Sequence, residues 1–260
     1  MTANPQKITL PVATRLLNPE IVYFEQIDST NNYLLSNHAH PTGTIVMAEY
    51  QTAGRGRRGR SWEAPKGEAL LFSCYLAVNP VETPLFIYTF IAAVSVREAL
   101  QKNISNASFY LKWPNDVLLE HHKVCGILVQ SKIVSAQKAI VVIGIGVNVN
   151  QSAEFFQQWQ TAGSLFSLIG KRFDRTDLLS DIVVSLDNWL QPEFTRQPEV
   201  VLRQWKMHCP FIGRMIQVDD GKHIFSGYFQ DVTSDGGLVL RSDSQVHLFH
   251  AADVTIVKEY

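Results

Sequence analysis

Four arginines and three glycines fill residues 54–60, and these residue types point to the binding of an anion. A guanidinium group offers a fork of N–H donors that suits phosphate and carboxylate oxygens, and glycine lets the backbone approach a ligand closely. Because unpaired cations this close together repel one another, we expect this arginine loop to be mobile until an anion binds. A solvated flexible loop or a contact with RNA would explain the same composition, so these residues alone leave the ligand open.

Two lysines stand in segments that could add to such a site. Lys112 begins the sequence KWPND at 112–116, which also holds an aromatic residue, an amide and a carboxylate at the expected end of a strand. Lys123 directly precedes the apolar run 124–129. A single lysine is usually solvated, so each gains meaning only if other charged groups lie close by. Gly144 and Gly146 lie in another apolar run, where they would either let a ligand approach the backbone or allow tight sheet packing.

The composition of the 260-residue chain limits what it can be. Hydrophobic residues make up 46% and charged residues 18%, which suits a folded protein with a sizeable core. The formal net charge of −1 provides no basic field for nucleic acid or membrane, so any phosphate site must be local. Cys74, Cys125 and Cys209 form no C-x-x-C pair, which favours reduced thiols in the cytoplasm. No uncharged stretch reaches the ~20 apolar residues that span a bilayer, so we expect a cytoplasmic protein with no membrane partner.

Hydrophobic periodicity predicts alternating strands and helices in the first two hundred or so residues. Strands are expected at residues 21–27, 44–50, 69–78, 109–112, 117–119, 124–131 and 140–148. Helices are expected from Ser29 or Thr30 to residue 35, and over 85–101, 178–190 and 198–205. After residue 210, five short apolar runs are separated by turns rich in Asp, Gly and Ser, which predicts a small barrel. This change, from alternating strands and helices to short strands alone, predicts a domain boundary near residue 210.

Taken together and in order, these segments resemble the biotin–protein ligases. The matching segments are DSTNN at 28–32, EYQ at 49–51, GRGRRGRSW at 54–62, LKWPNDV at 111–117, KVCGILVQ at 123–130 and GIGVNVN at 144–150. The arginine–glycine motif followed by KWPND is highly specific for this family, and the likeness covers about residues 20–260. It implies an α+β fold, with a short N-terminal extension over 1–19 and a catalytic domain over 20–209. That domain would be a mixed β-sheet flanked by helices, related to class II aminoacyl-tRNA synthetases, and an SH3-like β-barrel would follow over 210–260.

The resemblance also implies an activity in two steps. Biotin and ATP, with Mg²⁺, would give biotinyl-5′-AMP and pyrophosphate, and biotin would then pass to one lysine of a biotin carboxyl carrier protein. About 20 residues precede the first matching segment, whereas a DNA-binding winged helix needs on the order of 50. We therefore expect the monofunctional type, which binds no specific DNA and works as a monomer or weak homodimer.

The family's functional positions fall on named residues of this chain. Those matching biotin contacts are Ser29, Thr30, Asn31, Gln51, Arg55, Gly56, Arg57, Lys123, Gly126, Leu128, Gly144 and Gly146. Those matching contacts to ATP or the adenylate are Arg57, Arg60, Trp62, Lys112, Asn115, Asp116, Lys123 and Asn148. Lys123, Arg57 and Lys112 would be catalytic, because their charge offsets the repulsion between a carboxylate and a phosphate, and Asp116 would be the metal ligand. The sequence departs from the family at Leu71, where relatives often have an aromatic residue, and at Gln130, where many have glutamate.

Two other functions compete with this interpretation. A lipoate ligase or octanoyltransferase shares the catalytic fold, but its linear acyl chain would not need the polar residues around Ser29 and Gln51. An RNA-binding protein would show a broader basic surface and more stacking aromatics than Trp62 alone. His121 and His122 are expected to form a solvated turn, since adjacent residues of a strand point to opposite faces and cannot share a metal.

Overall fold

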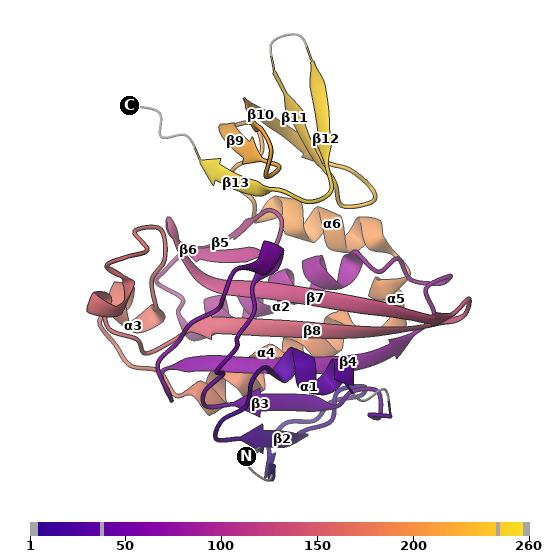
Figure 1. Cartoon of the computed structure of the whole chain (residues 1–260), viewed down its shortest axis with the longest axis vertical. Coiled ribbons are helices and arrows are strands. Elements are labelled where there is room, and N and C mark those ends of the chain that lie inside the picture. Colours follow the sequence, from indigo (N-terminus) through magenta and orange to yellow (C-terminus); the bar gives the residue numbers. More distant parts are fainter. Residues whose placement is uncertain (1–4, 37–38, 243–244, 257–260) are drawn as a thin grey trace.

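A computed structural model describes residues 5–36, 39–242 and 245–256 and shows a large sheet with helices on both faces, joined to a small second sheet (Figure 1). The large sheet has eight strands in the order β1-β2-β3-β4-β8-β7-β6-β5. Its strands are β1 Gln6–Thr9, β2 Glu20–Phe24, β3 Ile45–Ala48, β4 Ala69–Val78, β5 Phe109–Lys112, β6 Asp116–Leu119, β7 His122–Ser135 and β8 Lys138–Asn148. β2 and β3 run parallel and the other neighbours run antiparallel, so the predicted mixed sheet is confirmed.

The helices divide between the two faces of this sheet. α1 (Thr30–Ser36) packs against β3, β4 and β8 on one face, while α2 (Ile87–Asn103) and α4 (Arg175–Trp189) pack together on the other (Figure 1). α6 (Pro198–Met207) also packs on α2. Shorter helical segments are α3 Leu165–Ile169, α5 Pro192–Thr195, η1 Arg57–Gly59 and η2 Ala153–Phe156. Within the described ranges, no helix is long and apolar enough to cross a membrane.

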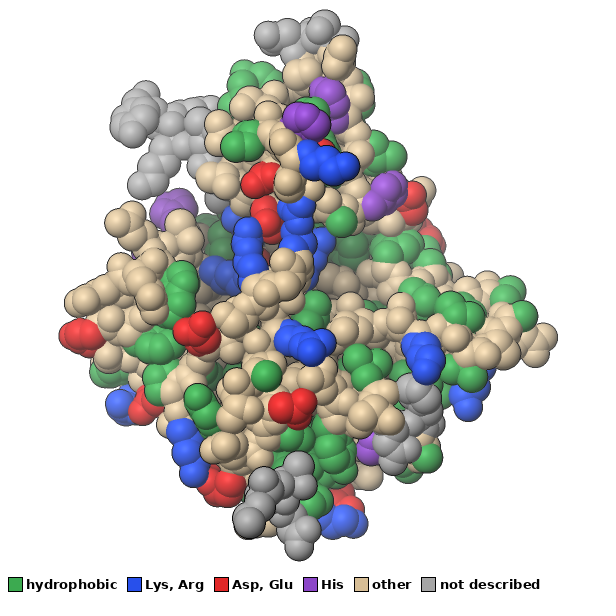
Figure 2. Space-filling model, viewed as in Figure 1, with side chains coloured by type: hydrophobic (Ala, Val, Ile, Leu, Met, Phe, Trp, Pro, Cys, Tyr) green, Lys and Arg blue, Asp and Glu red, His purple; other side chains and the backbone are tan. Residues whose placement is uncertain are grey.

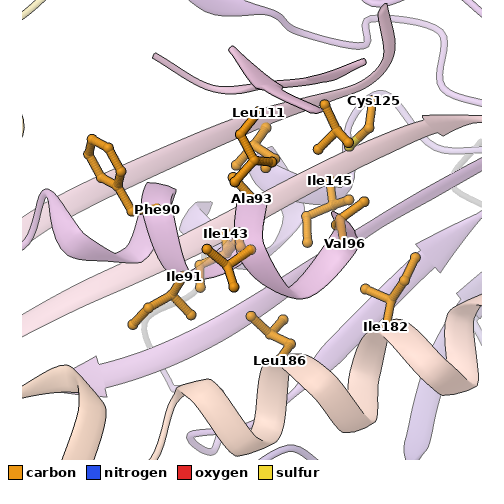
Figure 3. Close-up of a cluster of buried hydrophobic side chains, with 14 of the residues drawn as sticks. Phe90, Ile91, Ala93, Val96, Leu111, Cys125, Ile143, Ile145, Ile182 and Leu186 are labelled. Atoms are coloured by element: carbon orange, nitrogen blue, oxygen red, sulfur yellow. The ribbon is translucent and has the colours of Figure 1, made fainter. Parts of the chain in front are cut away.

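Residues of the strand β8 alternate between the two faces of the large sheet. Ile143 and Ile145 point into the main core, where Ala93 and Val96 of α2 and Leu186 of α4 meet them (Figure 3). Successive strand residues point to opposite faces, so Gly144 and Gly146 lie on the other face, which also carries α1. One face of β8 therefore stabilises the fold, and the glycines leave room on the other face.

A five-stranded antiparallel sheet follows the helices and is consistent with the predicted SH3-like barrel. Its strands are β9 Met215–Asp219, β10 Ile224–Val232, β11 Leu238–Arg241, β12 Val246–Phe249 and β13 Asp253–Ile256, in the order β12-β11-β10-β9-β13. The barrel is tied to the large domain by Trp113, whose Nε1 donates a hydrogen bond to the Gly236 carbonyl at 3.0 Å. Gly236 also packs so tightly on Phe86 that an added Cβ would lie 2.7 Å from that ring.

The N-terminal segment belongs to the large sheet, although the sequence suggested only an extension over 1–19. β1, which the sequence did not predict, pairs antiparallel with β2. The segment is then held by Asp187 of α4, whose carboxylate accepts hydrogen bonds from the backbone amides of Arg15, Leu16 and Leu17 at 2.7–2.8 Å. Asp187 is only 2% exposed, so these three amides depend on it rather than on water.

We expect Asp187→Ala to lower the free energy of unfolding by about 2–4 kcal/mol, because it leaves three amides without their charged acceptor. Urea denaturation followed by circular dichroism measures this loss. The control is Asp181→Asn on the same helix, whose exposed ion pair with Lys102 should be worth less than about 1 kcal/mol. Equal losses of unfolding free energy in the two variants would show that Asp187 stabilises the fold no more than an exposed ion pair does.

Candidate active site

A cavity of about 500 Å³ opens where the arginine loop, the glycine face of the sheet and the barrel meet. Figure 2 shows Lys and Arg side chains gathered in this hollow between the barrel and the large domain. Of the site residues expected from the sequence, all but Asn148 line it: Ser29, Thr30, Asn31, Gln51, Arg55, Gly56, Arg57, Arg60, Trp62, Lys112, Asn115, Asp116, Lys123, Gly126, Leu128, Gly144 and Gly146. Leu71 lines it too, and so does His121, which is exposed.

One end of the cavity is lined by buried polar groups at the start of α1. The backbone N–H of Thr30 donates to Gln51 Oε1 at 2.8 Å, and the Thr30 hydroxyl donates to the same oxygen at 3.1 Å. The Thr30 hydroxyl also lies 2.6 Å from the Ser73 hydroxyl of β4. Ser29 and Thr30 are both almost completely buried. This end therefore offers hydroxyl and amide groups that can both donate and accept hydrogen bonds.

Asn31 is held by three neighbouring strands. Its Oδ1 accepts from Ser73 of β4 at 2.6 Å, and its Nδ2 donates to the Leu128 carbonyl at 3.2 Å and to Gln130 Oε1 at 2.9 Å, both on β7. On β8 between them, a Cβ at Gly144 would lie 2.2 Å from Asn31 Oδ1, so only glycine fits there. The Asn31 amide is used within the protein and fastens α1 to the sheet. Ser73 was missed because one hydroxyl in an apolar strand gives no signal in the sequence.

Trp62 covers the glycine floor of the cavity. Gly126 of β7 and Gly146 of β8 are paired across the sheet, and the indole lies over both. An added Cβ at either glycine would lie 2.6 Å from the ring. The Lys123 ammonium is 5.6 Å from the ring centroid. The two glycines thus let an aromatic ring lie close against the sheet beside a cation.

Lys123, Lys112 and Arg57 all lie near the carboxylate of Asp116. Lys123 Nζ is 2.6 Å from Asp116 Oδ1. Lys112 lies opposite Asp116 in the backbone pairing of the β5–β6 hairpin. Burial lowers the pKa of Lys112; Asp116 opposes this shift and the charge of Lys123 adds to it. Burial also lowers the pKa of Arg57, whose guanidinium donates to Asn115 Oδ1 at 3.3 Å. Asp253 also acts on Lys112 and Arg57, but it is paired with Arg60 as well, so the two carboxylates leave positive charge over and the cluster is suited to an anion.

The barrel holds the outer side of the arginine loop. Arg58 donates to the carbonyls of Asp219 and Asp220, and Arg60 Nη2 lies 2.5 Å from Asp253 Oδ2. Within the loop, Gly56 N–H donates to the Arg60 carbonyl at 2.7 Å. The sequence suggested that all the arginines would stay mobile without an anion, but these contacts show that two of them have partners in the barrel. Arg57 instead donates to Asn115, next to Asp116.

Comparison with known proteins shows which class of protein this chain is similar to. The model of the biotin/lipoate A/B protein ligase family matches residues 23–148. The chain is 30% identical over 234 residues to the biotin–[acetyl-CoA-carboxylase] ligase of Paracoccus denitrificans, covering 87% of this chain and 96% of that one. It is 27% identical to the bifunctional ligase/repressor BirA of Bacillus subtilis, covering 96% of this chain and 78% of the relative.

Solved structures agree with these relatives. The biotin protein ligase of Aquifex aeolicus, in complex with biotin and ATP, superposes with a TM-score of 0.77 at 27% identity, covering 92% of this chain and 99% of that one. The chain belongs to the biotin protein ligase family.

We expect Asp253→Asn to loosen the arginine loop without unfolding the barrel. The ion pair with Arg60 is partly exposed, so it contributes no more than about 1 kcal/mol, which corresponds to roughly fivefold in an opening equilibrium. Hydrogen exchange at the Gly56 amide should therefore accelerate by about two- to fivefold. Asp231→Asn is the control, because Asp231 pairs with Lys206 elsewhere on the barrel. Unchanged exchange at Gly56 would show that the barrel does not hold the loop.

Proposed function

We propose that this chain is an ATP-dependent biotin–protein ligase that makes biotinyl-5′-AMP and then transfers biotin to a lysine of a biotin carboxyl carrier protein. The observation that carries the proposal is one cavity with two chemically different ends. The buried hydroxyl groups of Ser29 and Thr30 and the half-buried amide of Gln51 suit the ureido ring of biotin, which needs both donors and acceptors. The cations Lys112 and Lys123 suit the carboxylate of biotin and the α-phosphate of ATP.

In the first step, an oxygen of the biotin carboxylate attacks the α-phosphorus and pyrophosphate leaves. Two anions must approach each other, and negative charge builds up on the phosphate oxygens. Lys112, Lys123 and Arg57 already lie together in a partly buried cleft, so their charge stabilises this arrangement without much reorganisation. In-line alignment of the two reactants supplies much of the remaining acceleration. No side chain of the protein needs to form a covalent bond.

In the second step, the neutral amine of the acceptor lysine attacks the acyl carbon of the mixed anhydride. The bond from that carbon to the phosphate oxygen breaks, AMP leaves, and the amine loses its proton. Trp62 and the arginine loop line the cavity, so they would cover the bound anhydride and limit its hydrolysis by water. The barrel residues Asp219 and Asp253 also border the cavity, so an acceptor protein would approach between the two domains.

The donor set near the cations fits Mg²⁺ that arrives with ATP. Mg²⁺ in nucleotide sites is usually held by one or two carboxylates together with substrate phosphates. Among the described residues, no group of three or more His, Cys, Asp or Glu side chains forms a metal cage. Asp116 lines the cavity beside the lysines. We propose that Asp116 and the ATP phosphates would hold the ion, which would add positive charge near the departing pyrophosphate.

The cysteines support a cytoplasmic location. Cys74, Cys125 and Cys209 are free and buried, and burial raises the pKa of the Cys74 and Cys209 thiols to about 12. Free buried thiols are typical of a reducing compartment. We therefore propose that the protein works in the cytoplasm.

A direct test incubates the protein with biotin, ATP, Mg²⁺ and an apo carrier domain. The proposal expects biotin-dependent pyrophosphate release and a carrier mass increase equal to one biotin minus one water. Lipoate in place of biotin should give neither product, because a linear acyl chain leaves the polar groups around Gln51 unpaired. Transfer of lipoate at an equal rate would instead favour a lipoate ligase.

We expect Lys123→Ala to reduce adenylate formation by about 10²–10³-fold, since it removes a cation from the developing negative charge. The affinity for biotin itself should change much less, because the head-group end of the cavity is untouched. Single-turnover pyrophosphate release and biotin calorimetry separate the two effects. Lys138→Ala, at the exposed start of β8, is the control. Near wild-type pyrophosphate release by Lys123→Ala would remove Lys123 from this role.

The lowered pKa of Lys112 predicts how adenylate binding depends on pH. Above its lowered pKa, Lys112 is neutral in the free protein, whereas the bound phosphate favours its charged form. At a pH above this pKa, adenylate binding must take up a proton, so the affinity for the adenylate should fall as pH rises through the alkaline range. Calorimetry in buffers of different ionisation enthalpy measures this uptake. Lys112→Arg keeps its charge and should lose the effect, and identical proton uptake by this variant would contradict the assignment.

A further inference from the structure

The strand β5, which ends at Lys112, lies at the edge of the large sheet. Among the described strands it pairs only with β6, so its outer backbone groups need other partners. The segment that leads to the barrel provides one, because the Leu111 N–H donates to the His208 carbonyl just after α6 at 2.8 Å. Leu111 is buried and points into the main core (Figure 3), so the next residue, Lys112, is directed to the face that carries the cavity.

The barrel supplies a second restraint on the other side of Lys112. The Trp113 side chain is 1% exposed, and its indole N–H, the only polar group of the ring, donates to the Gly236 carbonyl at 3.0 Å. Trp113 is also the first residue of the turn that joins β5 to β6. The last residue of this turn, Asn115, exchanges hydrogen bonds of 2.6 and 3.0 Å with the Ile127 backbone of β7. The turn is therefore fixed to the barrel at its first residue and to the sheet at its last.

Gly236 is itself firmly held, so its carbonyl is a fixed acceptor. It lies in the tight turn between β10 and β11, where the Gly236 N–H donates to the Thr233 carbonyl at 2.9 Å and the Thr233 N–H donates to the Gly237 carbonyl at 2.8 Å. Gly236 has a φ of +83°, and an added Cβ would lie 2.7 Å from Phe86 and 3.0 Å from Phe90, at the start of α2. Only glycine therefore lets this barrel turn dock so closely on α2.

We propose that Trp113 is a positioning residue through which the barrel fixes Lys112 in the active site. The proposal rests on the function proposed above, in which Lys112 faces the biotin carboxylate and the α-phosphate. The two neighbours of Lys112 in the sequence bond to His208 and Gly236, so both restraints lead to the barrel or to the chain that enters it. The barrel thus sets the position of a cation that it does not itself carry.

The substitution Trp113→Phe tests this link, because it keeps an aromatic ring but removes the N–H that Gly236 accepts. The hairpin turn should then move away from the barrel and take the Lys112 backbone with it. A displacement near 1 Å in an active site can cost up to about 100-fold in rate. We expect kcat for adenylate formation to fall by about 10- to 50-fold, with the KM for biotin changed by less than about threefold, because the head-group end of the cavity is untouched.

The substitution Gly236→Ala reaches the same link from the barrel side. The added Cβ would push the turn off Phe86 and carry the carbonyl away from Trp113, so kcat should fall in the same way. All side chains that line the cavity stay unchanged in this variant. Thermal melting shows whether each variant is folded, and because the two changes lie in different domains, a folded form of either is enough for the test.

Each variant has a matched control away from the cavity. Trp189→Phe also removes an indole N–H, which donates to Glu98 on α2 at 2.9 Å, and neither residue lines the cavity. Gly213 has a φ of +84° and nothing within 4 Å of an added Cβ, so Gly213→Ala strains the backbone as Gly236→Ala does but without a clash. Both controls should keep kcat within about twofold of the wild-type value.

The decisive measurement is a double-mutant cycle that combines Trp113→Phe with Lys112→Met, read by single-turnover pyrophosphate release. If Trp113 acts through Lys112, Trp113→Phe should cost less than about twofold in the Lys112→Met background. Fully additive losses would overturn the proposal. So would a KM for ATP that rises while kcat stays unchanged, since Trp113 lines the cavity and this result would make it a direct contact to ATP. A wild-type protein that releases no pyrophosphate with biotin would instead refute the proposed function.

Discussion

The site depends on keeping Lys112, Lys123 and Arg57 close together in a partly buried cleft that has fewer carboxylates than Lys and Arg side chains. Such an arrangement is costly in the empty protein, because burial disfavours charge and the cations repel one another. The structure meets this cost with backbone geometry. A hairpin places Lys112 opposite Asp116, the ion pair with Asp116 restrains Lys123, and Asn115 holds Arg57. The unbalanced charge is what a carboxylate and a triphosphate neutralise on binding.

In the central strands, the residues that stabilise the fold and those that shape the site lie on opposite faces of the sheet. One face of β8 packs its branched side chains against α2 and α4, and this core stabilises the sheet. The opposite face carries glycines where Asn31 and Trp62 need room. A side chain at Gly144 or Gly146 would push away the very groups that shape the cavity. The barrel completes the site from outside, since its carbonyls and Asp253 bind Arg58 and Arg60, while Arg57 donates to Asn115.

Much of this could be predicted from the sequence, and what could not has a physical explanation. An uncharged run bounded by turn residues predicted β4 with its observed ends, because burial on both faces leaves a clear signal, and Pro114 marked the end of β5. The strand β1 was missed because its four residues are mostly polar and pair only through backbone hydrogen bonds with β2. Local motifs predicted the residues that line the cavity. Long-range contacts, such as Asp187 with residues 15–17 or Arg58 with the barrel, leave no local pattern.

In the proposed mechanism, these cations bring a biotin carboxylate oxygen onto the α-phosphorus of ATP. Biotin labelled with oxygen-18 in both carboxylate oxygens tests that bond directly, with mass spectrometry of the products after complete transfer to an apo carrier domain. Attack by the carboxylate leaves one labelled oxygen in the phosphate of AMP and none in pyrophosphate. Unlabelled AMP, or label in pyrophosphate, would show that the cleft joins different atoms and would contradict the mechanism.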